Sequence, residues 1–249
     1  MSARNAFFFS SVSVTRGFYR TTAPARYARP VIRLIVFDLD GTLVDSRADI
    51  ANAANALIVE RGGAPLPEDA VTAMVGEGAG LLVRRALTAA SLDPEAPGAL
   101  DRFLALYDAR LLEHTRPYDG IPEALEWLST RLPLAVLTNK PRGATRQILA
   151  GLGLARYFRE VIGGDSPFGR KPDPAALLHL ARASGVGPRD TLMVGDSAVD
   201  LKTARRAGTR ICLARYGFGY RIPESDIQDD DLRIGSPAEI IGTIETLLR

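Results

Sequence analysis

Cysteine and histidine are scarce in this 249-residue chain, which has one cysteine and two histidines. A single cysteine rules out an internal disulfide framework and fits a reducing compartment, so we expect a cytoplasmic protein. Cys212 lies in the apolar run 211–213, which indicates a buried small side chain. His114 and His179 lie in helical patterns without metal-ligand spacing, so we expect neither a zinc site nor histidine catalysis.

Three longer patterns are also missing from the sequence. No apolar run is long enough to span a membrane, so we expect no membrane partner. The chain has neither a glycine-rich P-loop nor a Gly-x-Ser-x-Gly elbow, which argues against a P-loop nucleotidase and a serine hydrolase. At 249 residues and 46% hydrophobic content, the chain can nevertheless bury a substantial core.

Acidic residues are absent from the first 33 positions, which contain six arginines. Removing those six from 31 basic residues leaves 25 against 29 acidic residues, a net charge of −4. This balance argues against a nucleic-acid partner. Residues 1–30 have the composition of a leader, and we favour a disordered tail or an extension from an upstream start codon over a targeting segment.

Apolar runs of strand length alternate with helical patterns from residue 34 onward. Several runs are continuous rather than alternating, as expected for strands that are covered on both faces. The alternation predicts an α/β protein with a doubly wound, mostly parallel sheet, whose ligands gather at the carboxyl ends of the strands. The expected strands are Leu34–Phe37, Leu134–Leu137, Glu160–Ile162, Leu192–Val194 and Ile211–Ala214.

Residues 47–116 interrupt this alternation, because they contain helical spacings and no convincing strand. We expect an all-helical insertion that leaves a core of residues 31–46 and 117–249. Ser46 and Asp49 have the spacing of a capping box at its start. Because the insertion follows the first acidic motif, we expect it to cover the site as a lid. A helical subdomain without a catalytic part is the alternative.

Two carboxylates, Asp38 and Asp40, stand two residues apart after the first strand. In an extended backbone they point the same way, and such a pair is unfavourable unless a cation compensates it. Gly41 and Thr42 then offer a turn, a hydroxyl and an amide that suit an oxyanion. The motif therefore predicts a metal and phosphate site with a nucleophile, and an ordinary acidic turn is the alternative.

Thr138 and Asn139 follow the second expected strand. Their hydroxyl and amide can both donate to a phosphate oxygen, although a turn cap is the more common explanation for such a pair.

Lys171 is one of only three lysines among 31 basic residues. Pro172 holds its backbone extended, so its ammonium could neutralise a phosphate from a stiff loop. Lys140, Lys171 and Lys202 all lie in or beside strand-end motifs, and a compact ammonium is not interchangeable with a guanidinium. An exposed surface lysine is the alternative.

Asp196 stands just after the fourth expected strand, and Asp200 follows four residues later. Mg²⁺ prefers carboxylates, carbonyl oxygens and substrate phosphate. Asp38 and Asp196, with the backbone carbonyl of Asp40, would meet that requirement. We expect Asp200 to orient the metal ligands without binding the metal itself, and a solvent-facing acid is the alternative.

These four motifs, in this order, resemble the haloacid dehalogenase-like hydrolase superfamily. The resemblance covers residues 31 to about 240 and implies a Rossmann-like core with an inserted helical cap. It implies that Asp38 attacks phosphorus and that Asp40 acts as acid and base. It further implies that Thr138 and Lys171 stabilise phosphoryl charge, and that Asp38, Asp40 and Asp196 hold Mg²⁺.

Within that superfamily, segments 74–80 and 117–125 are similar to those of phosphoglycolate phosphatases. The resemblance implies hydrolysis of a small phosphorylated metabolite, with 2-phosphoglycolate as the leading substrate. Other small phosphates (a sugar phosphate, an amino-sugar phosphate or pyrophosphate) and a phosphosugar mutase are the alternatives. We expect a monomer or a homodimer. The expected substrate contacts are Gly41, Thr42, Glu77, Gly78 and Asn139.

Overall fold

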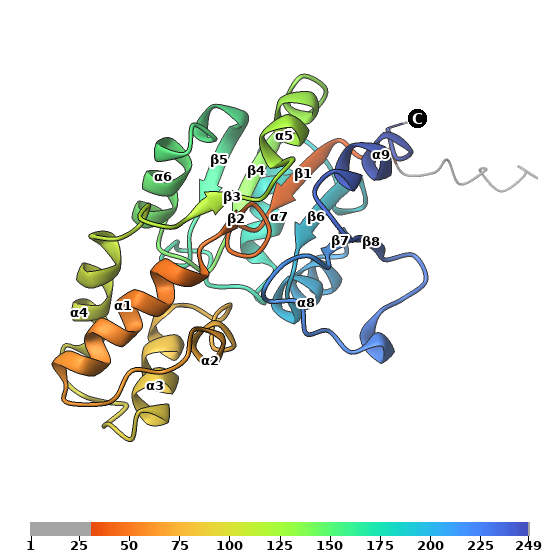
Figure 1. Ribbon diagram of the computed structural model, residues 1–249. Helices are drawn as coiled ribbons and strands as arrows, with labels where there is room; N and C mark the ends of the chain where they lie inside the picture. The colour runs from red at the N-terminus through yellow and green to blue at the C-terminus, as the bar shows by residue number, and fades with distance from the viewer. Residues whose placement is uncertain (1–30, 249) are drawn as a thin grey trace, which may run out of the picture.

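The computed structural model describes residues 31–248, in which a six-stranded sheet carries helices on both faces (Figure 1). The predicted leader, residues 1–30, lies outside the described residues. The strand order is β5-β4-β1-β6-β7-β8, and every neighbouring pair is parallel. The strands are β1 (Leu34–Phe37), β4 (Leu134–Leu137), β5 (Phe158–Ile162), β6 (Thr191–Gly195), β7 (Arg210–Ala214) and β8 (Leu232–Ile234).

Alternate residues of the central strand β1 enter two separate hydrophobic clusters. Ile35 and Phe37 face one cluster, and Leu34 and Val36 face the other. Helices α5 (Ile121–Ser129), α6 (Arg142–Gly151) and α9 (Glu239–Glu245) contribute to the first cluster, and α7 (Ala175–Ala183) and α8 (Ala198–Ala207) to the second. The predicted doubly wound parallel sheet is therefore confirmed.

All five predicted strands are present, with small shifts at their ends. β5 begins two residues earlier than expected, and β6 extends one residue at each end. The sequence did not reveal β8, because three residues with an exposed Arg233 at the centre give no apolar run. Short 3₁₀ helices connect other elements: η1 (Ala155–Tyr157), η2 (Pro188–Asp190) and η3 (Glu224–Asp226).

Four helices lie beyond one end of the sheet (Figure 1). They are α1 (Arg47–Glu60), α2 (Glu68–Thr72), α3 (Ala79–Ala89) and α4 (Ala99–Asp108). The chain enters them through β2 (Val44–Asp45) and returns through β3 (Arg116–Pro117), which pair antiparallel. The two connections therefore run side by side. The first hydrophobic cluster continues into these helices, so they pack on the same apolar core.

Helix α1 begins at Arg47 as expected, but the predicted capping box is wrong. The hydroxyl of Ser46 makes no cap bond and instead donates to Asp40 Oδ1 at 2.6 Å. The Asp49 carboxylate is fully buried and accepts from the N–H of His114 and from the N–H and hydroxyl of Thr115. Ser46 therefore serves the acidic motif before it, and donors at the return of the chain have replaced the local partners of Asp49.

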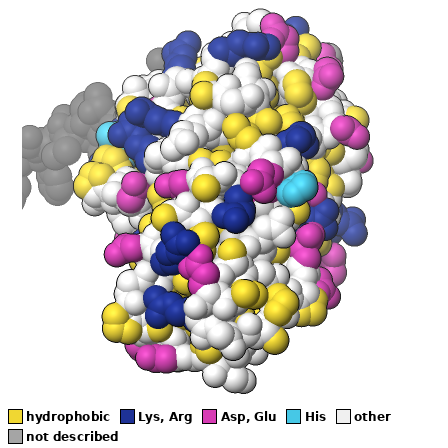
Figure 2. Space-filling model, turned by 60° about the vertical axis from the view of Figure 1, so that its left-hand side comes forward, with side chains coloured by type: hydrophobic (Ala, Val, Ile, Leu, Met, Phe, Trp, Pro, Cys, Tyr) yellow, Lys and Arg dark blue, Asp and Glu magenta, His cyan; other side chains and the backbone are white. Residues whose placement is uncertain are grey.

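The surface carries charges of both signs. Figure 2 shows basic and acidic side chains interspersed over one face of the described residues. Within residues 31–248 no helix has the length and apolar character needed to cross a membrane.

Candidate active site

The three central strands bring the sequence motifs to one edge of the sheet. β1 pairs with β4 on one side and β6 on the other, so their carboxyl ends are adjacent. Asp38, Thr138 and Asp196 follow these strands directly and line one pocket. Polar groups just beyond the ends of buried parallel strands take no part in the hydrogen bonds between strands, so they can face a ligand.

Asp38 is held by two donors on one of its oxygens. Oδ1 accepts from the N–H of Leu39 at 2.7 Å and lies 2.8 Å from Lys171 Nζ. Oδ2 has no hydrogen-bond partner among residues 31–248. Burial raises the pKa of Asp38 to about 7, against the opposing effect of Lys171. Asp38 therefore presents one fixed oxygen and one that is available to phosphorus or a metal ion.

Lys171 lies between two carboxylates in the interior. Its Nζ is 2.6 Å from Asp200 Oδ1, in addition to the contact with Asp38. Burial alone would lower the pKa of Lys171, but Asp200 and Asp38 together raise it, so the ammonium stays charged. Asp200 is itself completely buried and completes a capping box with Ser197 at the start of α8. The alternative of a solvent-facing Asp200 is therefore wrong.

Asp38, Asp196 and Asp200 form a cluster in which each offers an oxygen within 4.8 Å of the others. Burial, with repulsion from Asp200 and Asp38, raises the pKa of Asp196 well above its usual value. Among the described residues, Lys171 is the one ammonium in contact with this cluster. Three buried carboxylates with one ammonium leave excess negative charge, and the oxygen donors fit a hard divalent cation.

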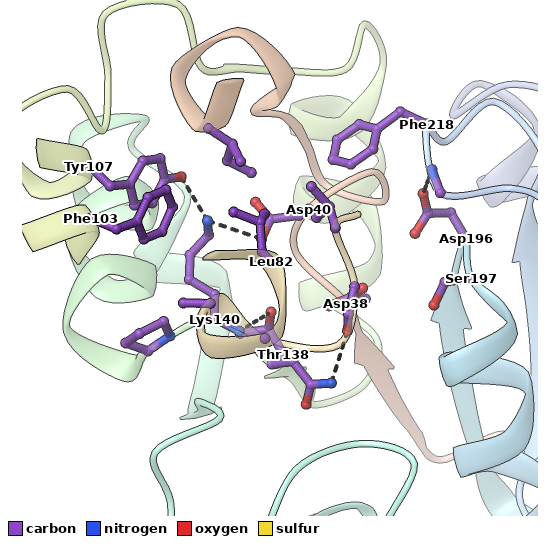
Figure 3. A pocket seen from close by; sticks show the side chains of 18 of the residues that line it. Asp38, Asp40, Leu82, Phe103, Tyr107, Thr138, Lys140, Asp196, Ser197 and Phe218 are labelled. Atoms are coloured by element: carbon purple, nitrogen blue, oxygen red, sulfur yellow. Dashed lines mark hydrogen bonds and ion pairs between the residues drawn. The ribbon is translucent and has the colours of Figure 1, made fainter. Parts of the chain in front are cut away.

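The Asp40 side chain points away from that cluster. It accepts from the hydroxyl of Ser46 at 2.6 Å and lies 3.1 Å from Lys140 Nζ (Figure 3). Thr138 is buried beside it, and its Oγ1 accepts from the N–H of Lys140 at 3.2 Å. The Thr138 hydroxyl proton is therefore free to donate toward the pocket.

Asn139 links three segments rather than offering a free amide. Its Nδ2 donates to the carbonyls of Gly76 and Lys171, each at 2.9 Å, which uses both amide protons. Its Oδ1 is buried without a partner in the described part of the chain. In this arrangement Asn139 ties the 74–78 loop to the Lys171 loop and has no donor left for a phosphate.

Gly41 lies against Asp196, and neither Gly41 nor Thr42 is in the lining of the pocket. Gly41 has φ +83°, and a Cβ there would come within 1.9 Å of an Asp196 carboxylate oxygen, so only glycine fits. Thr42 is fully buried, and its Oγ1 has no partner among the described residues.

The two expected contacts on the helical segment separate in the structure. Gly78 lines the pocket. The Glu77 carboxylate instead pairs with Arg85 at 2.7 Å, and both side chains are largely exposed. The structure therefore brings Gly78, but not the Glu77 side chain, to the other predicted residues.

Apolar side chains enclose the rest of this pocket, a cavity of about 60 Å³. Leu82, Phe103 and Phe218 are among them (Figure 3). Sequence reasoning missed Tyr107 and Gly219. Tyr107 fitted the apolar face of a helix, and nothing local links Gly219 to Asp196, whose Oδ2 accepts its N–H at 2.7 Å.

Comparison with known proteins places this architecture in one family. The family model described as haloacid dehalogenase-like hydrolase matches residues 35–214. A Rhodospirillum rubrum protein named phosphoglycolate phosphatase is 44% identical over 194 residues, covering 75% of this chain and 80% of its own. Pseudomonas aeruginosa phosphoglycolate phosphatase 1 is 38% identical over 220 residues, covering 85% and 77%.

A solved structure agrees with these matches. The crystal structure of a predicted phosphoglycolate phosphatase from Haemophilus somnus superposes with a TM-score of 0.78 at 32% identity, covering 85% of this chain and 97% of the other. The chain belongs to the haloacid dehalogenase-like hydrolase family.

Proposed function

We propose that the protein is a Mg²⁺-dependent phosphatase that hydrolyses a small phosphomonoester, foremost 2-phosphoglycolate, through a phosphorylated Asp38. The observation that carries this proposal is the contact of Lys171 with Asp38 beside a buried carboxylate cluster, in a small pocket. A nucleophilic carboxylate, a fixed cation and a site for a second cation are what phosphoryl transfer requires.

In the first step a carboxylate oxygen of Asp38 attacks phosphorus, and the bond between phosphorus and the ester oxygen breaks. Asp40 donates its proton to the departing alkoxide, which leaves as an alcohol. Ser46 and Lys140 hold the Asp40 carboxyl in place through contacts of 2.6 and 3.1 Å.

In the second step water attacks phosphorus of the aspartyl phosphate. Asp40, now a carboxylate, takes the proton of that water, and the Asp38 carboxylate departs as inorganic phosphate forms. Lys171 and the Thr138 hydroxyl offset the charge on the phosphoryl oxygens in both steps. Asp200 acts as a positioning residue, because it holds the Lys171 ammonium at 2.6 Å.

Mg²⁺ would be held by Asp38, Asp196 and the carbonyl of Asp40, where it would neutralise phosphoryl charge. Asp200 lies close enough to orient these ligands. Gly41 permits Asp196 to take up its place.

A small carboxylate-bearing substrate is the best match to the helical segment. Residues 47–116 act in this proposal as a lid, and Gly78 and Ala79, where α3 begins, line the pocket. Relatives at 38–44% identity bear the name phosphoglycolate phosphatase, which supports the same substrate. We propose a cytoplasmic location, which the buried free thiol of Cys212 fits, and a monomer or homodimer.

Phosphate release from a panel of small phosphomonoesters, with Mg²⁺ and with a chelator, tests this function. We expect release from 2-phosphoglycolate that requires Mg²⁺ and falls at least about 10³-fold in Asp38→Asn, because the amide is not a nucleophile. Asp101→Asn, at an exposed position on α4, is the matched control. Isomerised sugar phosphate without net phosphate release would favour a mutase, and undiminished activity of Asp38→Asn would sink the assignment.

A further inference from the structure

Lys140 is a buried cation that faces the pocket. Its side chain is 6% exposed, and its Nζ lies 2.7 Å from the phenolic oxygen of Tyr107 and 3.1 Å from Asp40 Oδ2 (Figure 3). The ammonium is held between a carboxylate and a phenol oxygen. Burying an ammonium is costly unless its donors are used.

Two donors at this point have no acceptor. An ammonium donates three hydrogen bonds, and within residues 31–248 Lys140 Nζ has two partners, Asp40 and Tyr107. The Tyr107 oxygen accepts from Lys140, and its own proton has no acceptor in the described chain. Burial raises the pKa of Tyr107 to about 12, so the phenol keeps that proton. One N–H and one O–H thus lie side by side, as a carboxylate requires.

Lys140 is also the one cationic side chain in the lining of this pocket, as far as the described chain goes, whereas Asp38, Asp40 and Asp196 supply three acids. The nearby Arg170 donates to the carbonyl of Gly164 and does not line the pocket. Lys171 already contacts two carboxylates. A second anionic group on a substrate would therefore have Lys140 as its cationic partner.

The position of Lys140 matches one particular anionic group. Asp40 serves the ester oxygen in the proposed mechanism, and Lys140 contacts Asp40 directly. In 2-phosphoglycolate the carboxylate carbon is two covalent bonds from that oxygen. A carboxylate so close to the leaving group lies beside Asp40, where Lys140 and Tyr107 are.

We propose that Lys140 and Tyr107 bind the carboxylate of the substrate and so set the preference for a short phosphorylated carboxylic acid. This inference rests on the proposed phosphatase function. Lys140 follows β4 in the sheet, and Tyr107 belongs to α4 of the lid, where it stacks on Phe103. The two halves of the carboxylate site therefore come from the sheet and from the helical segment, and they meet only when that segment lies over the sheet.

The test compares 2-phosphoglycolate with 2-hydroxyethyl phosphate, which has the same length and no charge at its far end. We expect the wild type to prefer the acid by about 30-fold or more in kcat/KM, since a buried charge-assisted hydrogen bond has that effect. Lys140→Met should lower kcat for both esters, because Lys140 also holds Asp40, but it should raise KM only for the acid and so bring the ratio toward one. Tyr107→Phe should lower the ratio about five-fold. Lys202→Met, at an exposed lysine, should leave the ratio unchanged.

The outcomes separate this inference from the function on which it rests. A wild type that hydrolyses neither ester refutes both. A wild type that hydrolyses both equally well refutes the carboxylate site alone, and so does a Lys140→Met variant that loses both activities equally. Thermal unfolding of each variant checks its fold. If Lys140→Met does not fold, Tyr107→Phe still tests the carboxylate site, because it keeps the Lys140–Asp40 pair.

Discussion

Replacing Asp196 with asparagine should stabilise the metal-free protein while it disables the proposed metal site. Asp196 is 1% exposed, and oxygens of Asp38 and Asp200 lie within 4.8 Å of its own. At that distance and an effective dielectric constant of 20, each like-charged neighbour costs about 3 kcal/mol. Attraction to Lys171 and proton uptake by the cluster offset most of this cost. An asparagine oxygen can still accept the N–H of Gly219, so we expect a gain of about 1–3 kcal/mol at pH 8.

Mg²⁺ should reverse the order of stability. At a concentration 100 times its Kd, a ligand that binds only the folded state adds about 3 kcal/mol. For a domain of this size that corresponds to a rise in Tm of about 5–10 °C. Asp196→Asn lacks one of the proposed ligands, so its Tm should barely respond.

Differential scanning calorimetry in EDTA and over a Mg²⁺ titration measures both effects. Asp49→Asn is the matched control, because Asp49 is equally buried but accepts hydrogen bonds from His114 and Thr115 and lies outside the cluster of Asp38, Asp196 and Asp200. It should lose about 1–3 kcal/mol in both conditions and keep the response to Mg²⁺. An Asp196→Asn protein that is less stable than the wild type in EDTA, yet responds normally to Mg²⁺, would refute the reasoning.

Two further predictions concern the pH dependence of stability and the hydrogen bonds of Asn139. In EDTA the free energy of unfolding should fall as pH rises from about 4 to about 7. Burial raises the folded-state pKa of Asp38 from 3.8 to about 7, so the folded protein binds the proton more tightly than the unfolded chain does. Urea unfolding at pH 5 and pH 8 measures this difference, and equal stability at the two pH values contradicts it. Asn139→Ala removes the hydrogen bonds to Gly76 and Lys171, so amide exchange in residues 76–81 should accelerate and KM should rise about ten-fold. Unchanged exchange would show that Asn139 does not tie the 74–78 loop to the Lys171 loop.

The sequence predicted the sheet because its central strands are buried on both faces. Leu34–Phe37 and Leu134–Leu137 are continuous apolar runs, and the strands have the same bounds in the structure. The edge strand β8 was missed, because Arg233 faces solvent and interrupts the only apolar signal. The acids at the strand ends are equally visible in the sequence. A carboxylate at the end of a buried strand costs free energy and does not help the strand to pack, so it indicates a functional role.

Partner choice, by contrast, was decided by the tertiary structure. Ser46 and Asp49 have the spacing of a capping box, yet Ser46 donates to Asp40 and Asp49 accepts from residues 114 and 115. Asn139 stood in a motif that suits phosphate, and its two amide protons are used by the carbonyls of Gly76 and Lys171. Local spacing gives the possible partners of a polar side chain, and folding selects among them by bringing in competitors that are distant in sequence.

The sequence by itself determined the parallel sheet, the helical segment between residues 47 and 116, and the acids and lysines at the strand ends, because periodicity and residue type are local properties. Only the tertiary structure placed Lys171 between Asp38 and Asp200, and Lys140 against Asp40 and Tyr107. Those contacts join residues 29 to 133 positions apart, and no sequence period records them. The physical reason is that a buried charge takes whichever counter-charge the packed chain brings within reach.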